Sequence, residues 1–284
     1  MSLSYAGSDL TPLGRLFVRL VENLSGQALM KKAYKRYKLL DHSDSARFFR
    51  NAAIALHLEI DAHPRSLEYI PETGPLLIVA NHPFGAMDGL AIAASVETRR
   101  SDLRIIIWGA IDVPEANEHF LALDLAENSR KALRQNVLIR RKAISHLRSG
   151  GAILLFPSGC VERSASPWHT PCEQPWTPLA GRLAREGGAR ILPVYVPGHN
   201  SRLFHMASFM GDTVRRALFL HETGRLIGKR VRLHIGKALS LVTLLVDDSD
   251  QQLTEKMRLL VMKEQPSSGR TVLDSNDQHH HLVQ

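Results

Sequence analysis

The first forty residues follow two helical patterns of apolar and basic positions. From Thr11 to Leu24, large apolar side chains recur every three or four residues, which predicts an amphipathic helix over residues 11–24. Ser25 and Gly26 interrupt the pattern, and residues 27–40 then place five Lys or Arg side chains among Leu, Met and Tyr. Two compatible interpretations are open. The helices can pack on a domain with solvated basic faces, or they can form a membrane-surface hairpin that presents cations to anionic headgroups and apolar side chains to the interface.

Beyond residue 42, aliphatic runs that end at Gly or Pro alternate with segments of helical period. This alternation predicts an α/β fold with a mostly parallel central sheet covered by helices on both faces. We expect this domain to span residues 43–264, between N-terminal helices over residues 1–42 and an aperiodic tail over residues 265–284. The predicted strands are 76–80, 103–109, 152–157, 190–196 and 230–236, and the predicted helices are 89–98, 129–148 and 179–186.

Three local patterns give more specific expectations. Ser43 or Asp44 can cap a helix through residues 45–56, and residues 57–75 favour short strands and a turn. The helix over residues 129–148 should stop at two glycines. Its expected packing face consists of Leu133, Val137, Ile144 and Leu147.

Composition restricts the functional classes. Hydrophobic residues make up 44% of the 284-residue chain and charged residues 23%, as in ordinary globular proteins. The net charge of +8 favours acidic partners such as an anionic membrane surface or phosphate-bearing substrates. Only 6% of residues are aromatic, and no zinc-finger or ribonucleoprotein motif occurs, so we expect no nucleic-acid partner. The two cysteines give no disulfide framework, and neither a signal peptide nor a membrane-spanning helix is expected.

The stretch "ANHPFGAMDGL" concentrates chemistry directly after the predicted strand 76–80. His82 and Asp88 stand six positions apart, with a Pro-Phe-Gly turn between them. Ligand sites in open α/β sheets gather at the carboxyl ends of strands, and a carboxylate on one imidazole nitrogen leaves the other nitrogen to accept a proton from a hydroxyl. The alternative is an aspartate that caps the following helix beside an unrelated loop histidine.

Two later blocks accompany this turn: "LLFPSG" at 154–159 and "ILPVYV" at 191–196. Together, the three blocks resemble the glycerophospholipid acyltransferase superfamily, which includes 1-acylglycerol-3-phosphate and other lysophospholipid acyltransferases. "NHPFGAMDGL", "VPGHNSRLF" and the segment that follows are similar to the bacterial hemolysin-like branch, which is related to acyltransferases of ornithine-type lipids. The resemblance covers about residues 76–236.

The resemblance implies a metal-independent enzyme on the cytoplasmic side of the bacterial inner membrane, without a cofactor. His82 would be the general base on the acceptor hydroxyl, and Asp88 would orient it. The acyl donor would be a thioester of acyl carrier protein or coenzyme A, the acceptor a lysolipid, and Gly159 would shape the loop beside the acceptor. By the same resemblance, we expect the substrates to contact Asn81, Phe84, Gly85, Phe156, Pro157, Ser158, Gly159 and Glu162.

The chain departs from the family pattern at two places. Ser158 stands where the family carries a glutamate, with Glu162 nearby as a candidate substitute. The family's phosphate-gripping arginine block has no clear counterpart. Arg130 and Arg134 are the candidates for this role, although they can equally be the solvated face of a helix. Both departures favour a lysolipid whose head group is not a simple phosphate.

Three rival interpretations remain at the level of sequence. Cys160 could act as a nucleophile, but no separate base is indicated for it. The same histidine base could activate water and hydrolyse a lipid ester. The basic amphipathic N-terminus alone would suit a non-enzymatic lipid-binding protein.

In the loop "SPWHTPCEQPWTP", Trp168, His169 and Trp176 are expected to pack beneath the loop, or alternatively to line an acyl channel.

Overall fold

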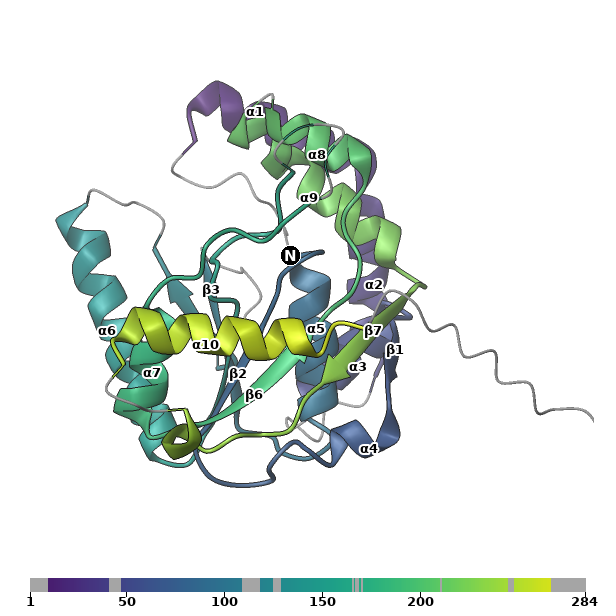
Figure 1. The fold of residues 1–284 in the computed structure, drawn as a ribbon. Coiled ribbons are helices and arrows are strands. Elements are labelled where there is room, and N and C mark those ends of the chain that lie inside the picture. Colours follow the sequence, from purple (N-terminus) through teal and green to yellow (C-terminus); the bar gives the residue numbers. More distant parts are fainter. Residues whose placement is uncertain are drawn as a thin grey trace, which may run out of the picture.

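A seven-stranded sheet forms the centre of the computed structural model (Figure 1). The structure describes residues 10–40, 47–108, 118–124, 129–164, 166, 169, 171–209, 211–244 and 248–266. The strand order is β1-β7-β6-β2-β5-β3-β4, and every neighbouring pair is parallel except β6 with β7. The strands are β1 (Glu59–Ala62), β2 (Leu76–Ala80), β3 (Leu103–Trp108), β4 (Phe120–Leu123), β5 (Ala152–Leu155), β6 (Arg190–Tyr195) and β7 (Arg230–Ile235).

Helices cover both faces of the sheet, as the sequence predicts. Side chains alternate along β2, so that Leu76 and Ile78 pack in one core and Leu77 and Val79 in the other. The first core includes α3 and α5, and the second includes α6, α7 and α10. The helices are α1 (Pro12–Ser25), α2 (Gln27–Lys38), α3 (Phe48–Ala55), α4 (Pro64–Leu67), α5 (Ala86–Val96), α6 (Arg130–Arg148), α7 (Leu179–Gly187), α8 (Arg202–Phe209), α9 (Asp212–Leu226) and α10 (Asp250–Lys263).

Most predicted elements form close to their expected bounds. In the segment 57–75, however, only one strand forms. The short helix α4, which begins with Pro64, takes the place of a second strand. Strand β4 and helices α8, α9 and α10 were not predicted as elements. The candidate caps Ser43 and Asp44 and most of the predicted C-terminal tail lie outside the described residues.

The N-terminal helical hairpin forms, but its apolar stripe faces outward. Helix α1 packs against α9 and buries Val18 and Glu22 completely. The large apolar side chains on its opposite side are 41–81% exposed: Leu13, Leu16, Phe17, Leu20 and Leu24. Among the described helices, none is both long and apolar enough to cross a membrane.

Helix α6 also differs from the expected packing. Leu133 and Val137, which were predicted to face the core, are 54% and 39% exposed. The buried face instead consists of two alanines, Ala132 and Ala143, together with Ile139 and Leu147. The prediction of a helix is confirmed, and the prediction of its buried face is wrong in these two positions.

Candidate active site

Three neighbouring strands end at the same place and bring the predicted motifs together. In the sheet, β2 lies between β5 and β6, and the pairs Val79–Leu155 and Ala80–Val194 are in register. The turn that carries His82 therefore leaves the sheet beside the turn that begins at Phe156. This carboxyl edge is where open α/β sheets bind their ligands.

The side chains of His82 and Asp88 are in direct contact. His82 Nδ1 lies 3.0 Å from Asp88 Oδ2, which also accepts hydrogen bonds of 2.9 Å from the backbone N–H groups of Phe84 and Gly85. Gly85 has φ +93°, a conformation that favours glycine and folds the chain back before α5 starts. Asp88 is completely buried, and its Oδ1 has no hydrogen-bond partner among the described residues.

The contact fixes which nitrogen of His82 can act as a base. Because a carboxylate only accepts hydrogen bonds, the Nδ1 atom must donate its proton to Asp88, which leaves Nε2 as the proton acceptor. The His82 side chain is 17% exposed. Its ring stacks on Phe156, the first residue after β5, with a centroid distance of 3.9 Å and an interplanar angle of 22°, so that this ring holds the plane of the imidazole. The arrangement suits general-base chemistry on a hydroxyl or water.

Asn81 ties the histidine turn to the two neighbouring segments. Its side chain donates to the backbone oxygen of Val196 at 2.8 Å and accepts from the backbone N–H of Val196 at 2.7 Å. It also donates to Glu162 Oε1 at 3.2 Å, and the Glu162 backbone N–H donates to the His82 carbonyl. These buried hydrogen bonds hold the backbone on both sides of His82.

Two carboxyl groups near the turn have strongly raised pKa values. Burial raises the pKa of Glu162 to about 7; the hydrogen bond from Asn81 opposes this shift, and the charge of Asp88 adds to it. Burial also raises the pKa of Glu173 to about 8. The nearby side chains of Trp176 and Ser158 oppose this shift, and the charge of Glu162 adds to it. Both carboxyls are therefore close to titration at neutral pH.

Sequence reasoning missed Glu173. It lies in the Pro-rich loop and reaches the site because Arg163 and Cys172 pair as an antiparallel bridge. No sequence spacing predicts that a residue in this loop lies near His82, so the only sequence signal for Glu173 was an acidic residue between two prolines. Trp176 is buried in the second core, as the packing interpretation predicts, His169 is exposed, and Trp168 lies outside the described residues.

The turn after β5 is shaped by a glycine and held by hydrogen bonds to its carbonyls. Gly159 has φ +68°, and the Pro157 carbonyl accepts from both the backbone and the hydroxyl of Thr177. The Ser158 hydroxyl donates to the Cys160 carbonyl at 3.0 Å. Burial raises the pKa of the Cys160 thiol, although the charges of Arg163 and Arg215 oppose this shift, so the environment does not favour a thiolate nucleophile.

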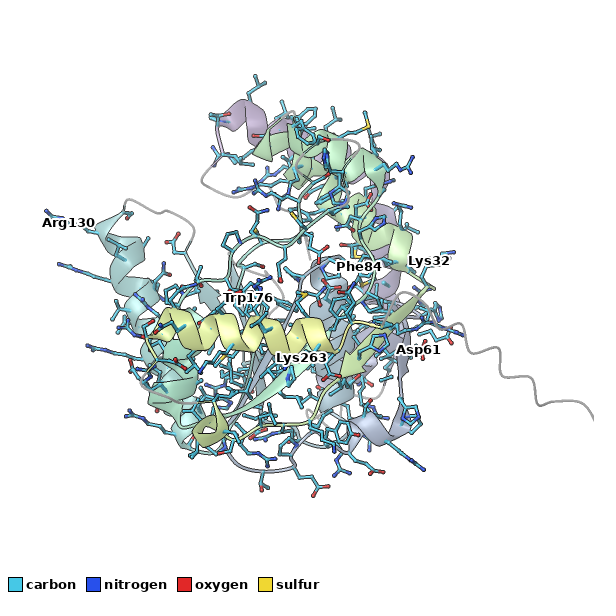
Figure 2. The ribbon with its side chains drawn as sticks, viewed as in Figure 1. Lys32, Asp61, Phe84, Arg130, Trp176 and Lys263 are labelled. Atoms are coloured by element: carbon cyan, nitrogen blue, oxygen red, sulfur yellow. The ribbon has the colours of Figure 1, made fainter. Side chains whose placement is uncertain are left out.

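Arg130 and Arg134 lie apart from this constellation. Both are exposed at the start of α6, and no described contact connects either one to His82 or Asp88. Arg130 points away from the body of the molecule (Figure 2). The other predicted site residues are brought together, and these two are not.

The fold and the oriented histidine define an α/β protein suited to base-assisted transfer or hydrolysis. The chain matches the model of the acyltransferase family over residues 47–263, and it belongs to that family. No curated protein matches its sequence. Among solved structures it is similar to the 1-acyl-sn-glycerophosphate acyltransferase PlsC from Thermotoga maritima, with 16% identity and a TM-score of 0.48, over 87% of this chain and 95% of that chain. The predicted acyltransferase family is thus confirmed, and the hemolysin-like or ornithine-lipid branch stays a prediction.

Proposed function

We propose that the protein transfers a fatty acyl group from a thioester donor to the hydroxyl of a lysolipid at a membrane surface. The observation that carries this proposal is the contact between His82 and Asp88 at the carboxyl edge of the sheet. His82 Nε2 takes the proton of the acceptor hydroxyl as its oxygen attacks the thioester carbonyl carbon. The carbon–sulfur bond then breaks, and the departing thiolate takes the proton from the imidazolium. The reaction needs no metal or further cofactor.

The charges around the turn after β5 support an acceptor with a head group of mixed charge. The cations of Arg163 and Arg215 act on Cys160 together with the carboxyl of Glu173. Glu162, whose pKa is raised to about 7, lies in the same region and is about half ionised at neutral pH, whereas Glu173, whose pKa is raised to about 8, is mainly protonated, so a partial negative charge accompanies the two cations. A phosphate monoester carries only negative charge, whereas the carboxylate and ammonium of an amino-acid head group match this arrangement better. We therefore assign a lyso-ornithine-type or other zwitterionic lysolipid as the preferred acceptor.

The outward apolar stripe of α1 supports attachment to an anionic membrane, on the cytoplasmic side that the resemblance to the acyltransferase superfamily implies. Helix α8 adds exposed Leu203 and Met206 at the same end of the molecule as α1 (Figure 1). Exposed apolar side chains gathered in this way mark interaction surfaces. The neighbouring α2 presents four exposed lysines suited to anionic headgroups: Lys31, Lys32, Lys35 and Lys38.

The direct test is to incubate the purified protein with lysolipids and with palmitoyl thioesters of coenzyme A or acyl carrier protein. Lipid mass spectrometry should detect a diacyl product with the wild-type protein and none with His82→Ala. Release of free fatty acid without a diacyl product would show hydrolysis instead. No product from any acceptor and donor would overturn the proposal.

A further inference from the structure

A group of buried polar side chains lies beside the catalytic turn, outside the contact between His82 and Asp88. It consists of Asn200, His205 and Arg215, which are 2%, 4% and 5% exposed. They come from three segments: the turn after β6, helix α8 and helix α9. We call this group the buried donor cluster, because a guanidinium, a side-chain amide and a neutral imidazole each carry N–H donors.

The segment after β6 places Asn200 next to the catalytic turn. Its first residue, Val196, is hydrogen-bonded to the side chain of Asn81 through both its N–H and its carbonyl. Gly198 packs so closely on the Phe84 ring that a side chain at this position would collide with it. Two residues later, the side-chain nitrogen of Asn200 has no hydrogen-bond partner among the described residues. The segment therefore leads from the catalytic turn directly into the buried donor cluster.

Two aromatic rings hold the guanidinium of Arg215. Its central carbon lies 5.8 Å from the ring centroid of Phe204 on α8 and 5.4 Å from that of Phe219 on α9. Such contacts stabilise a desolvated cation. Burial raises the pKa of the Cys160 thiol, and the charge of Arg215 is among those that oppose this shift. The guanidinium therefore acts at the turn after β5, on the same edge of the sheet as His82.

His205 completes the cluster from α8. Its ring centroid lies 6.2 Å from that of His199, and neither of its nitrogens makes a hydrogen bond of normal geometry with a described residue. Burial lowers the pKa of His205, and the charges of His199 and Arg215 add to this shift, against the charge of Glu222 and the backbone of Asn200. The imidazole is therefore mainly neutral at pH 7 and carries one N–H donor.

A carboxylate on the same side of α9 as Arg215 is directed elsewhere. Glu222 follows seven positions later, which is nearly two helical turns. It accepts hydrogen bonds from the backbone N–H and the hydroxyl of Ser201 and pairs with Arg225 at 3.0 Å. Because Ser201 directly precedes α8, these contacts fix the start of α8 against α9 and hold the cluster in place.

The chemistry of the cluster points to an anionic ligand. A buried donor that finds no acceptor destabilises the fold, and a buried cation is stabilised by a paired anion. Carboxylate and phosphate oxygens act as acceptors, and they pair with guanidinium groups in bidentate geometry. Since the three side chains converge beside the catalytic turn, the anion that suits them is one that a substrate carries.

We propose that the buried donor cluster is the subsite for the acidic group, a carboxylate or a phosphate, of the acceptor's head group. This inference rests on the proposed acyl transfer and names residues that select the acceptor. It places this selection on α8 and α9 and not on Arg130 and Arg134, which lie apart from the catalytic turn. Helix α8 turns Leu203 and Met206 outward and His205 inward, so the subsite lies beneath the surface proposed to bind the membrane (Figure 1).

The test compares Arg215→Gln with Arg216→Gln, a change of the next and more exposed arginine on α9. The acceptors form two pairs that differ only in the acidic group: a hydroxyacyl amino acid with its methyl ester, and 1-acylglycerol-3-phosphate with 1-acylglycerol. In Arg215→Gln, kcat/KM for the acidic member should fall about tenfold or more, mainly through KM, and that for the neutral member should stay within about twofold. Arg216→Gln should behave like the wild type.

The two pairs distinguish the possible acids, because the pair in which the preference disappears identifies a carboxylate or a phosphate. An equal loss for both members of each pair would overturn the subsite, since it would show a general defect or a contact with the donor. If Arg215→Gln does not melt cooperatively, His205→Phe takes its place. This variant keeps a buried ring but removes the N–H donor, and it should show the same acid-specific loss to a smaller extent.

A binding measurement separates this inference from the proposed function. Titration calorimetry in the His82→Ala background measures the affinity for both pairs of acceptors, as short-chain forms that are monomeric in solution, with and without Arg215→Gln. Stronger binding of an acidic member that disappears in Arg215→Gln supports the subsite, even if the wild-type protein transfers no acyl group. Equal binding of the acidic and neutral members, or a preference for the acid that survives Arg215→Gln, would overturn it.

Discussion

At the scale of single residues, one carboxylate oxygen serves two structural purposes. Asp88 Oδ2 accepts from the Gly85 N–H at the start of α5 and also contacts His82 Nδ1. The sequence presents helix capping and histidine orientation as alternatives, whereas the geometry allows both at once. The catalytic role of the pair stays a prediction.

The raised pKa of Glu162 predicts a specific pH dependence of stability. Between its ordinary pKa of 4.5 and about 7, the unfolded chain loses the proton that the folded protein keeps, so stability falls as pH rises through this window. Glu162→Gln removes the titration and keeps an oxygen that can accept from Asn81. We expect the melting temperature of the variant, relative to the wild type, to rise by roughly 5 °C between pH 5 and pH 8. A difference that does not change with pH would contradict the burial of an ionisable carboxyl here.

At the scale of elements, periodicity predicts a helix more reliably than the surface that the helix buries. Helices α1 and α6 form where the pattern places them, yet each turns large apolar side chains outward. In α1, Val18 and Glu22 face α9, and in α6 two of the four buried side chains are alanines. Small and polar side chains contribute little to a hydrophobic pattern, so packing through them is hidden from a sequence analysis.

The exposed apolar stripe of α1 predicts which substitutions weaken binding of the protein to membranes. Leu16→Glu combined with Leu20→Glu should reduce binding to phosphatidylglycerol vesicles more than about tenfold, since burial of one leucine contributes ~1.5–3 kcal/mol. The melting temperature should hardly change, because both side chains are exposed. Leu259→Glu, at a similarly exposed position on α10, is the matched control and should bind normally. Vesicle binding that survives the double substitution would exclude α1 as the anchor.

At the scale of the whole molecule, the class of fold and the central motif were predictable, and the periphery of the site was not. Residues 76–80 and 152–155 mark their strands by unbroken aliphatic runs, and the turns that follow come together because parallel strands end at one edge. Glu173 joins the site through a bridge within an irregular loop, and such pairing depends on tertiary contacts that leave no trace in local spacing.

The mixed charges around the catalytic turn predict the choice of acceptor. The cations of Arg163 and Arg215 and the carboxyl of Glu173 act on Cys160, and Ser158 replaces the glutamate that the family pattern carries. We expect kcat/KM for 1-acylglycerol-3-phosphate to be at least about tenfold below that for a lysolipid with an amino-acid head group, which corresponds to ~1.4 kcal/mol in binding of the transition state. A side-by-side assay with equal acyl chains is the measurement. A preference for the phosphate acceptor would contradict the assignment.

The most direct test of the account is the turnover of four proteins: wild type, His82→Ala, Asp88→Asn and the double variant, each with a thermal melt as folding control. His82→Ala should cost about 10²–10⁴ in rate, and Asp88→Asn up to about 10⁴, since an amide can favour the wrong imidazole tautomer. Because the two side chains act as a unit, the double variant should be little worse than the poorer single variant. If Asp88 only caps α5, Asp88→Asn should hardly matter, because Asn caps helices about as well as Asp. Near-normal turnover in a folded Asp88→Asn or His82→Ala would contradict the account.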